Sequence, residues 1–473
     1  MNPSMCHSPV DELGRQSSVV TLPHDLFFND LVTKEYNRLH QTGHTYLDYT
    51  GGNLYAQSQL TQHHTLLSSH VIGNPHSSNP TSDFATTLVE AARSEVLKFF
   101  NADDYYCVFT QNASGALKIV GECYPFDPSS VLVLLADNHN SVNGIREYCS
   151  GKGGTFYYCP VRYQDLTIDE SQLATRLADH PEARHKLLAF PAQSNVSGVQ
   201  HDLGWIAYAQ RRGWDVLLDA AAWVPTTQLD LTKVTPDFVS VSFYKMFGYP
   251  TGIGCLLIRK SRFKKLTKPW FAGGTVALAS VQSPHHYLAA RHERFEDGTV
   301  NYLDIPAVSI GLNYLNAIGM RRIHERVVGL SRWLATELPT IRHDSGVSVV
   351  NIFGPEDRRN TGGTLMMNFS NRHGRGYPPD VIEALANRRR ISLRSGCFCN
   401  PGIDEINHRL TDEELRRYFS SRGHGDYRDM VRALNKMRGA VRVSVGIATT
   451  QRDLDTFISL VRSLRNKSIS AAG

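Results

Sequence analysis

The sequence has 473 residues, of which 41% are hydrophobic and 20% are charged, and its formal net charge is +5. A chain of this length exceeds one ordinary hydrophobic core, so we expect a main domain and a smaller one. The net charge is small and Lys and Arg are scattered, which argues against a nucleic-acid partner. No apolar stretch approaches the roughly 20 residues that span a bilayer, and no signal pattern opens the chain. We therefore expect a cytoplasmic protein without a membrane partner.

From about Tyr46 to Lys260, apolar strand-like runs alternate with amphipathic helix-like stretches. The predicted strands are Tyr105–Thr110, Val131–Asp137, Thr155–Val161, Leu187–Pro191, Asp215–Ala220, Phe238–Phe243 and Gly254–Arg259. The helices predicted between them include Ala113–Cys123, Ser141–Tyr148 and Leu203–Arg212. Strands that are apolar on both faces and separated by helices predict an α/β fold, with a mostly parallel seven-stranded sheet covered on both sides.

A long helical segment, about Ile310 to Leu338, is predicted to lead into a smaller α+β domain. Its predicted strands are Thr364–Phe369, Ile391–Arg394 and Ala440–Val445, and its predicted helices are Pro379–Arg388, Asp412–Tyr418, Arg428–Met437 and Gln451–Leu464. Thr450 and Asp453 form a capping box for the last helix. We expect residues 1–44 to join the small domain, residues 45–325 to form the large domain, and residues 326–473 to form the small one.

Two charged residues follow neighbouring apolar strands of the large domain. Asp219 ends the run that begins at Asp215, and Lys245 ends the run that begins at Asp237. Ligands of parallel sheets bind outside the carboxyl ends of the strands, where both residues fall. An amine there can form a Schiff base with pyridoxal 5'-phosphate, and a carboxylate can keep the pyridine nitrogen protonated so that the ring accepts electrons. The pair predicts a pyridoxal-phosphate enzyme that acts on an amino acid.

The first strand-to-helix connection, residues 109–118, predicts a phosphate cradle. It offers free backbone N–H groups, the hydroxyl of Ser114 and the positive end of a helix dipole. Ser242 can add a hydroxyl from a position three residues before Lys245. Thr299, preceded by Gly298, supplies a further Gly-Thr pair suited to phosphate.

Four more residues are candidates for the same site, each with a plainer alternative. His139 could stack on the cofactor and move protons, although a lone His after a strand is commonly a turn or core residue. Asn195 could donate to the phenolic oxygen of the cofactor or merely close an Asx-turn. Arg394 and Arg442, on short strands, could bind a substrate carboxylate or form surface ion pairs, and Arg442 is the better candidate.

A loop marked by Gly and Pro, residues 393–402, carries Cys397 and Cys399. Such a loop keeps a thiol accessible, and neighbouring Arg394 favours the nucleophilic thiolate. The C-x-C spacing could suggest metal, but no second thiol or histidine cluster has ligand spacing, so we expect no metal site. A disulfide between these two cysteines would be strained. The dispersed positions of the eight cysteines fit free thiols in a reducing compartment.

Taken together, these segments resemble class V, fold-type I pyridoxal-phosphate enzymes of the cysteine desulfurase group. The nearest resemblance is to the N-terminal desulfurase domain of eukaryotic molybdenum cofactor sulfurase. The matching segments are Tyr46–Asn53, Gly73–Ser77, Asp137–Val142, Pro191–Gly198, Leu218–Ala221, Ser242–Lys245, Arg294–Thr299, Leu393–Gly402 and Arg442–Gly446. The resemblance spans about residues 45 to 465 and implies an aspartate aminotransferase-like large domain.

The resemblance also implies roles for the cofactor site. Lys245 would carry the Schiff base, Asp219 would pair with the pyridine nitrogen, and His139 would stack on the ring. The residues that would hold phosphate are Ala113, Ser114 and Ser242. Thr299 would reach the phosphate of the neighbouring subunit, because these enzymes are usually homodimers with sites at the interface.

The implied reaction uses two residues of the later part of the chain. Cys399 falls where the family carries its persulfide, and Arg442 falls where it binds the substrate carboxylate. The enzyme would release alanine from L-cysteine or a relative and leave a persulfide on Cys399. A sulfur-acceptor protein would then receive the sulfur.

Several departures from the family pattern keep other interpretations open. Tyr244 and Ala222 stand where many desulfurases place His and Gln, and Ile403-Asp404 stands where Ala-Cys is common. Molybdenum-type relatives also carry a further C-terminal domain, which we do not expect within 473 residues. A second interpretation is a pyridoxal-phosphate C–S lyase, a β- or γ-replacement or cyclisation enzyme, an epimerase or a decarboxylase of specialised metabolism, in which Cys399 carries no sulfur. A third is a non-enzymatic scaffold, which Lys245 and Asp219 disfavour.

Overall fold

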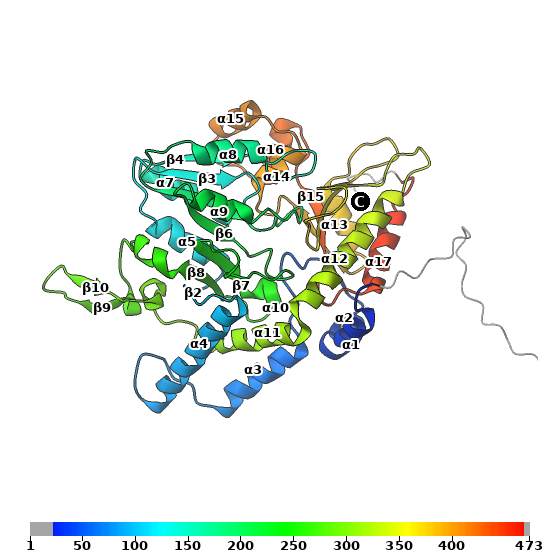
Figure 1. Ribbon diagram of the computed structural model, residues 1–473. Coiled ribbons are helices and arrows are strands. Elements are labelled where there is room, and N and C mark those ends of the chain that lie inside the picture. Colours follow the sequence, from blue (N-terminus) through cyan, green and yellow to red (C-terminus); the bar gives the residue numbers. More distant parts are fainter. Residues whose placement is uncertain (1–21, 468–473) are drawn as a thin grey trace, which may run out of the picture.

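The computed structural model describes residues 22–467, and a seven-stranded sheet forms its centre (Figure 1). The strands, in spatial order, are β2 (Tyr105–Thr110), β8 (Gly254–Arg259), β7 (Phe238–Ser242), β6 (Asp215–Asp219), β5 (Lys186–Pro191), β3 (Val131–Leu135) and β4 (Thr155–Cys159). The neighbours from β7 to β4 pair in parallel, whereas β8 runs antiparallel to both of its neighbours. The predicted α/β fold with a mostly parallel sheet is confirmed.

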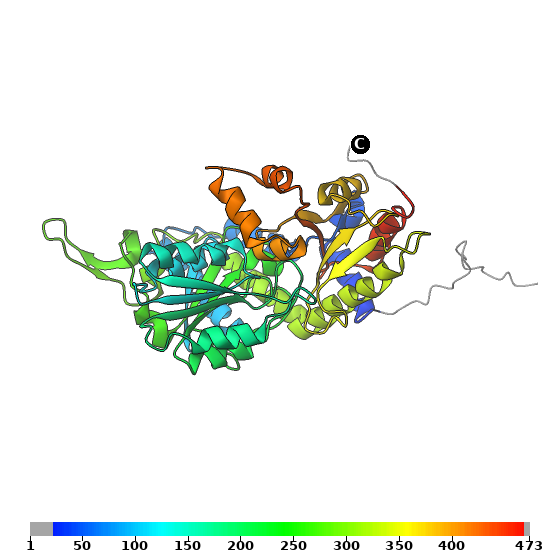
Figure 2. The same cartoon turned by 90° about the horizontal axis from the view of Figure 1, so that it is seen from above.

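The sheet is buried on both faces because successive side chains of its strands enter two separate cores. Val133 of β3 belongs to one core, and Leu132 and Leu134 belong to the other. Figure 2 shows helices on both sides of the sheet. The helices of this layer arrangement are α5 (Ala113–Cys123), α6 (Asn140–Asn143), α7 (Ile145–Gly151), α8 (Glu170–Ala178), α9 (Gly204–Gln210) and α10 (Phe243–Phe247). Double burial explains why these strands are near-continuous apolar runs.

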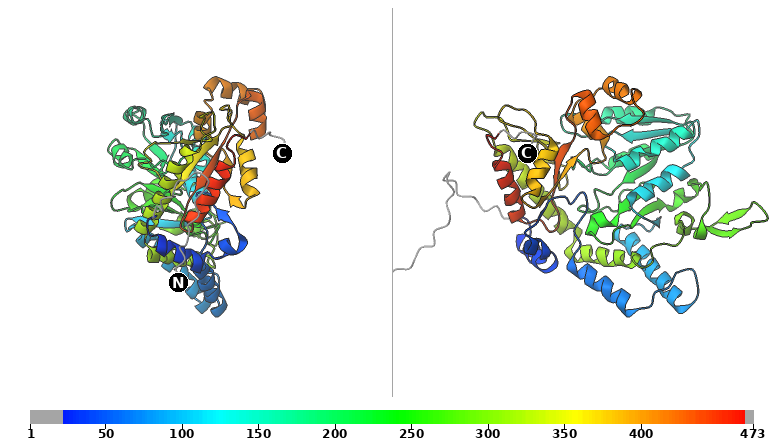
Figure 3. Two further views of the ribbon diagram at one scale, coloured as in Figure 1. Left: turned by 90° about the vertical axis from the view of Figure 1, so that its right-hand side faces the viewer. Right: turned by 180° about the vertical axis from the view of Figure 1, so that it is seen from behind.

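A second, four-stranded sheet is antiparallel throughout. Its spatial order is β11 (Val350–Phe353), β12 (Thr364–Phe369), β15 (Ala440–Ser444) and β14 (Arg394–Gly396). Helices α13 (Pro379–Asn387) and α12 (Met320–Glu337) pack against it, and Figure 3 shows α17 (Gln451–Arg462), in red, on the same side of the molecule. The predicted capping box of α17 is confirmed, because Thr450 and Asp453 bond reciprocally.

The predicted long helix of residues 310–338 is two helices, α11 (Ile305–Ile318) and α12. Gly319 interrupts them with a φ of 92°, a conformation that glycine adopts without steric cost. The predicted boundary at residue 325 falls inside α12, and the division into three parts stays a prediction. Residues 1–21 of the predicted N-terminal segment lie outside the described residues.

Several elements have no counterpart among the predicted ones. They include α1 (Asp25–Glu35), α2 (Arg38–Thr42), β1 (Thr45–Tyr46), α3 (Gln57–Ser69), α4 (Pro80–Phe99), α8, the projecting hairpin β9 (Val276–Ala279) and β10 (His286–Leu288), β11, β13 (Ile391–Ser392) as a strand apart from β14, and α14 (Pro401–Asn407). Helices α15 (Asp412–Ser420) and α16 (Tyr427–Leu434) follow α14. Across residues 22–467, no helix has the length and apolar character that crossing a membrane requires.

Candidate active site

One cavity lies at the carboxyl ends of β5, β6 and β7 and at the start of α5. Seven predicted site residues line it, namely Ala113, Ser114, His139, Asn195, Asp219, Ser242 and Lys245. Tyr244 and Ala222, which depart from the desulfurase pattern, line the same cavity. The rule that parallel sheets bind ligands at their carboxyl edge therefore located this cavity from the strand pattern alone.

Lys245 reaches the cavity because β7 ends at Ser242 and the short helix α10 begins at the next residue. Burial lowers the pKa of its ammonium group, and the nearby Asp219 carboxylate opposes that shift. Arg442 adds to the lowering as a like charge. A lysine with a lowered pKa is more readily a free amine, which is the form that attacks a carbonyl group.

Asp219 is the last residue of β6 and is 8% exposed. Its Oδ1 accepts hydrogen bonds from Ser240 Oγ (2.9 Å) and from the backbone N–H of Ala221 (3.1 Å). Among the described residues no hydrogen bond reaches Oδ2, so this oxygen remains available to a donor in the cavity. A fixed, negatively charged acceptor in this position suits a protonated ring nitrogen.

His139 caps helix α6, and its Nδ1 accepts a hydrogen bond from the backbone N–H of Ser141 (3.1 Å). Burial lowers the pKa of the imidazole, Asp219 partly opposes this, and Lys245 reinforces it. The ring is therefore held neutral, with its proton on Nε2. A neutral planar ring that is fixed by its own helix cap can lie against a flat ligand.

Three hydroxyl groups gather at the N-terminus of α5. Ser242 Oγ accepts from the backbone N–H of Ala113 (2.8 Å), and Ser114 Oγ lies 2.6 Å from Ser141 Oγ. Asn112 caps the helix by accepting from the N–H of Gly115 (3.0 Å). Hydroxyls at the positive end of a helix form a site for a phosphate group. Ser141 was not among the predicted site residues, although it lies in the predicted helix that follows His139.

These groups together fit pyridoxal phosphate. An amine faces the same cavity as a carboxylate, and a neutral aromatic ring and hydroxyls at a helix N-terminus also line it. The cofactor presents a matching aldehyde, pyridine nitrogen, ring face and phosphate. Lys245, Asp219, His139 and Ser114 are the residues that would meet these four parts.

The two predicted arginines do not line the cavity but meet at Asp48. Arg442 Nη2 donates to Asp48 Oδ1 (2.8 Å), and Arg394 donates to Oδ2 through Nε (3.0 Å) and Nη2 (2.7 Å). Arg442 is 3% exposed, whereas half of the Arg394 side chain is exposed. Sequence reasoning missed Asp48, and its position in the segment Tyr46–Asn53 was the only signal.

Cys399 lies outside the cavity lining and is the exposed thiol of its loop, whereas Cys397 is half-buried. The carbonyl of Cys399 accepts a hydrogen bond from the backbone N–H of Asn140 (2.7 Å), the residue after His139. This bond holds the thiol-bearing backbone against the segment that also forms the cavity. The guanidinium of Arg442 lies 4.9 Å from the ring centre of Phe398, the residue before the thiol.

Thr299 lies apart from the Lys245 cavity and is exposed. Its neighbours Gly298 and Val300 line a separate hollow, which also includes His76 and the ion pair of Arg93 with Glu296. Within one described chain, Thr299 therefore does not join the other predicted phosphate ligands.

The comparison with protein families gives a match along most of the chain. Residues 45–457 match the model of the aminotransferase class-V family. A molybdenum cofactor sulfurase of Arabidopsis thaliana is 34% identical over 470 residues, which cover 91% of this chain and 57% of the relative. The chain thus spans little more than half the length of this curated relative.

Two solved structures share the fold. The apo cysteine desulfurase of Thermococcus onnurineus NA1 superposes with a TM-score of 0.76 at 22% identity, covering 92% of this chain and 97% of that chain. The cystine C–S lyase C-DES, in complex with its product cysteine persulfide, superposes with a TM-score of 0.68 at 16% identity, covering 89% and 98%. The same fold is therefore found in a cysteine desulfurase and in a cystine C–S lyase.

Proposed function

This chain belongs to the aminotransferase class-V family, and from that premise we propose that it is a pyridoxal-phosphate-dependent cysteine desulfurase. It would convert L-cysteine to alanine and retain the sulfur as a persulfide on Cys399. One observation carries the proposal: the backbone of Cys399, whose thiol is exposed, is hydrogen-bonded to Asn140, next to His139, and His139 lines the cavity that contains both Lys245 and Asp219.

Each residue of the cavity would have a separate role in the reaction. Bound pyridoxal phosphate withdraws electrons from the α-carbon of an amino acid joined to it. Lys245 would hold the cofactor and, once released by the substrate, accept and return the α-proton, a task for which a lowered pKa is suited. Asp219 would keep the pyridine nitrogen protonated, and His139 would cover the ring and exclude water.

Arg442 is proposed to hold the substrate carboxylate. Its Nη groups already donate to Asp48 and to the backbone oxygen of Asn195 (2.9 Å). Its Nε is buried and has no hydrogen-bond partner among the described residues. A buried donor without a partner is costly, so a carboxylate that accepts from it would be bound favourably.

The sulfur transfer is a displacement at the substrate sulfur. The Cys399 thiolate attacks Sγ of L-cysteine, a new S–S bond forms, and the Cβ–Sγ bond breaks. The electron pair of that bond remains on the substrate carbon, which takes up a proton and leaves as alanine. The balance is one thiol and one L-cysteine converted to one persulfide and one alanine, without an external oxidant.

The test is product analysis with purified holoenzyme, L-cysteine and a reductant. Wild type should release alanine and sulfide in equal amounts, and Cys399→Ala should lose both while it retains the cofactor. Cys397→Ala is the matched control, because burial raises the pKa of the Cys397 thiol and makes it a poor nucleophile. Alanine formation that persists in Cys399→Ala would contradict the assignment of the sulfur carrier.

A second candidate is a C–S lyase that uses the same cavity without the thiol. The absence of Cys399 from the cavity lining, within the described residues, favours this candidate. A lyase would give pyruvate, ammonia and sulfide from L-cysteine, equally in wild type and Cys399→Ala. Lack of any turnover of L-cysteine would instead point to replacement, cyclisation, epimerisation or decarboxylation of another amino acid.

We also propose a homodimer in which Thr299 completes the phosphate site of the partner chain. The exposure of Thr299 and its absence from the lining of the Lys245 cavity support this arrangement. A sulfur-acceptor protein would receive the persulfide sulfur from Cys399, in the cytoplasm. Light scattering that gives twice the 52.9 kDa chain mass would support the dimer, and a monomer would count against it.

A further inference from the structure

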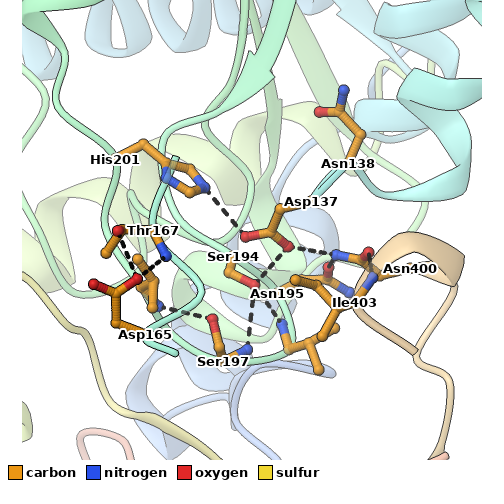
Figure 4. A network of polar contacts seen from close by, with 12 residues as sticks. Asp137, Asn138, Asp165, Thr167, Ser194, Asn195, Ser197, His201, Asn400 and Ile403 are labelled. Carbon is orange, nitrogen blue, oxygen red and sulfur yellow. Dashed lines mark hydrogen bonds and ion pairs between the residues drawn. The ribbon is translucent and has the colours of Figure 1, made fainter. Parts of the chain in front are cut away.

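A fully buried carboxylate, that of Asp137, contacts the loop that carries Cys399. Asp137 follows β3, is 0% exposed, and accepts hydrogen bonds from three side chains (Figure 4). Ser194 Oγ (2.8 Å) and Asn400 Nδ2 (2.7 Å) donate to its Oδ1, and His201 Nε2 lies 3.1 Å from its Oδ2. A buried carboxylate needs such partners, so Asn400 is one of the groups that stabilise Asp137 in its buried position.

Asn400 is itself 0% exposed and joins three segments with one amide. Its Nδ2 donates to Asp137 and to Asn195 Oδ1 (3.1 Å), and its Oδ1 accepts from the N–H of Ile403 (3.3 Å) as the cap of α14. Gly402 allows the close contact, because a Cβ there would overlap the carbonyl oxygen of Ala136. The start of α14 is therefore pressed against the end of β3.

The two residues before Asn400 have a strained backbone. Phe398 and Cys399 both have left-handed conformations, with φ of 56° and 54°. Such a conformation costs a residue other than glycine about 1–2 kcal/mol. Each carbonyl is held from outside the loop: Asn195 Nδ2 donates to the oxygen of Phe398 (2.8 Å), and the N–H of Asn140 donates to that of Cys399 (2.7 Å). Strain of this kind persists only where the surroundings over-determine the conformation.

Asn195 connects this loop to the cavity. It lines the cavity, its backbone oxygen accepts from Arg442 Nη1, and its side chain binds both Phe398 and Asn400. The second N–H of the Asn195 amide group has no partner among the described residues and would be available to the phenolic oxygen of the cofactor. Asn195 is thus a residue of the cavity lining that is hydrogen-bonded directly to the thiol loop.

We propose that Asn400, anchored by Asp137, is a positioning residue that fixes Cys399 in the geometry required for sulfur transfer. This inference rests on the proposed desulfurase function. Asn400 touches neither the substrate nor the reacting sulfur and acts through the backbone of Cys399. Reaction requires the two sulfur atoms in a near-attack arrangement, and a misplacement of about 1 Å can cost about 100-fold in rate.

The test compares Asn400→Ala with wild type, both as holoenzyme. In a single turnover with L-cysteine, mass spectrometry should show Cys399 persulfide forming at least about tenfold more slowly in the variant, a barrier increase of about 1.4 kcal/mol. The cofactor spectrum and the L-cysteine concentration that half-saturates its change should stay as in wild type. Asn368→Ala is the matched control, because it removes another amide–amide bond to α14, from Asn368 to Asn407 (3.1 Å), away from the thiol.

A second pair of variants distinguishes a loss of positioning from a loss of folding. Asp137→Asn keeps an acceptor oxygen for Asn400 and should keep most of the persulfide rate, whereas Asp137→Ala should resemble Asn400→Ala. Backbone hydrogen exchange at residues 397–400 should be faster in Asn400→Ala than in Asn368→Ala. A wild-type persulfide rate or unchanged exchange in Asn400→Ala would overturn the inference. A wild type that forms no persulfide would overturn the proposed function and the positioning role together, and exchange would still decide whether Asn400 holds the loop.

Discussion

Arg394 and Arg442 lie directly opposite each other on the antiparallel strands β14 and β15, and the carboxylate of Asp48 binds both. Like charges at opposed positions of a sheet repel, so Asp48 offsets a repulsion that the register creates. Gly51 leaves room for this ion pair, because a Cβ at this position would lie 2.5 Å from Asp48 Oδ2 and 2.6 Å from Arg394 Nη2, so both side chains would have to shift. The arginine proposed for substrate binding therefore depends on an acidic residue far from it in the sequence.

Asp48→Asn should lower the free energy of unfolding by about 3–5 kcal/mol, because it leaves the Arg442 guanidinium buried without its ionic partner. Urea unfolding measures this change. The double variant with Arg442→Gln should lose less than the sum of the single variants, since it contains no unpaired buried charge. Additive losses would show that Asp48 and Arg442 are not energetically coupled.

Asp219→Asn tests the carboxylate that would face the pyridine nitrogen. A neutral amide would no longer keep that nitrogen protonated, so kcat should fall at least about tenfold, equivalent to about 1.4 kcal/mol, with little change in KM. Ser240→Ala should have a smaller effect, because it removes only one hydrogen bond to Asp219 Oδ1. Steady-state kinetics with L-cysteine measure both variants, and equal effects on kcat would argue against a role for the charge.

Lys245→Ala should abolish the visible absorbance of the lysine-linked cofactor, both alone and combined with either of these variants.

The sequence predicted most of the large sheet because its strands are buried on both faces and end at polar residues. β2 and β8 have the predicted bounds, and β6 ends at Asp219, one residue before the predicted end. The cavity followed from the same logic, since Asp219 and Lys245 mark the carboxyl edge. A single glycine, Gly319, divides a helix that apolar periodicity alone presents as continuous.

The remaining contacts depend on residues that are distant in the sequence. Asp48 reaches Arg442, and Asp137 reaches Asn400, across hundreds of positions, and neither carboxylate differs in local pattern from a surface or turn residue. Helix α4 was missed although Asn79 caps it and Pro80 begins it, because its buried face contains polar and small residues such as Ser82 and Arg93. Pairing between segments that are distant in the sequence is a tertiary property, and local periodicity carries no information on it.

Thr299→Val tests the proposed dimeric phosphate site. The substitution keeps the shape of the side chain but removes its hydroxyl, so the loss of cofactor on dilution should accelerate while the dimer persists. Cofactor release followed by absorbance, with light scattering on the same samples, separates the two effects. The control is Asp297→Asn, which alters an exposed residue of the same loop, bound to Lys268 (2.6 Å), and leaves the Thr299 hydroxyl in place. Unchanged retention in Thr299→Val would place Thr299 outside the phosphate site.

His139→Phe tests the neutral state of the ring through the pH dependence of stability. The pKa of His139 is lowered from 6.5 in the folded protein by burial, so below pH 6.5 the unfolded chain binds a proton that the folded chain does not. The free energy of unfolding of the apoprotein should therefore fall as the pH drops below 6.5 and recover as it rises again, by at most about 1.4 kcal/mol per pH unit for one group. Phe keeps an aromatic ring and removes this titration, so the decline between about pH 7.5 and about pH 5.5 should be shallower in the variant.

Other ionisable groups also make stability depend on pH, and they are present in both wild type and His139→Phe. His185, His292 and His408 also have lowered pKa values through burial, and the raised pKa values of Asp237 and Glu405, likewise caused by burial, act in the opposite direction. Because these five groups are present in wild type and in His139→Phe, their contributions cancel in the difference between the two urea-unfolding curves. Curves that remain parallel across this pH range would mean that His139 takes up its proton as readily in the folded protein as in the unfolded chain. A ring that is charged near neutral pH would repel Lys245 and could not serve as the neutral cover of the cofactor that we propose.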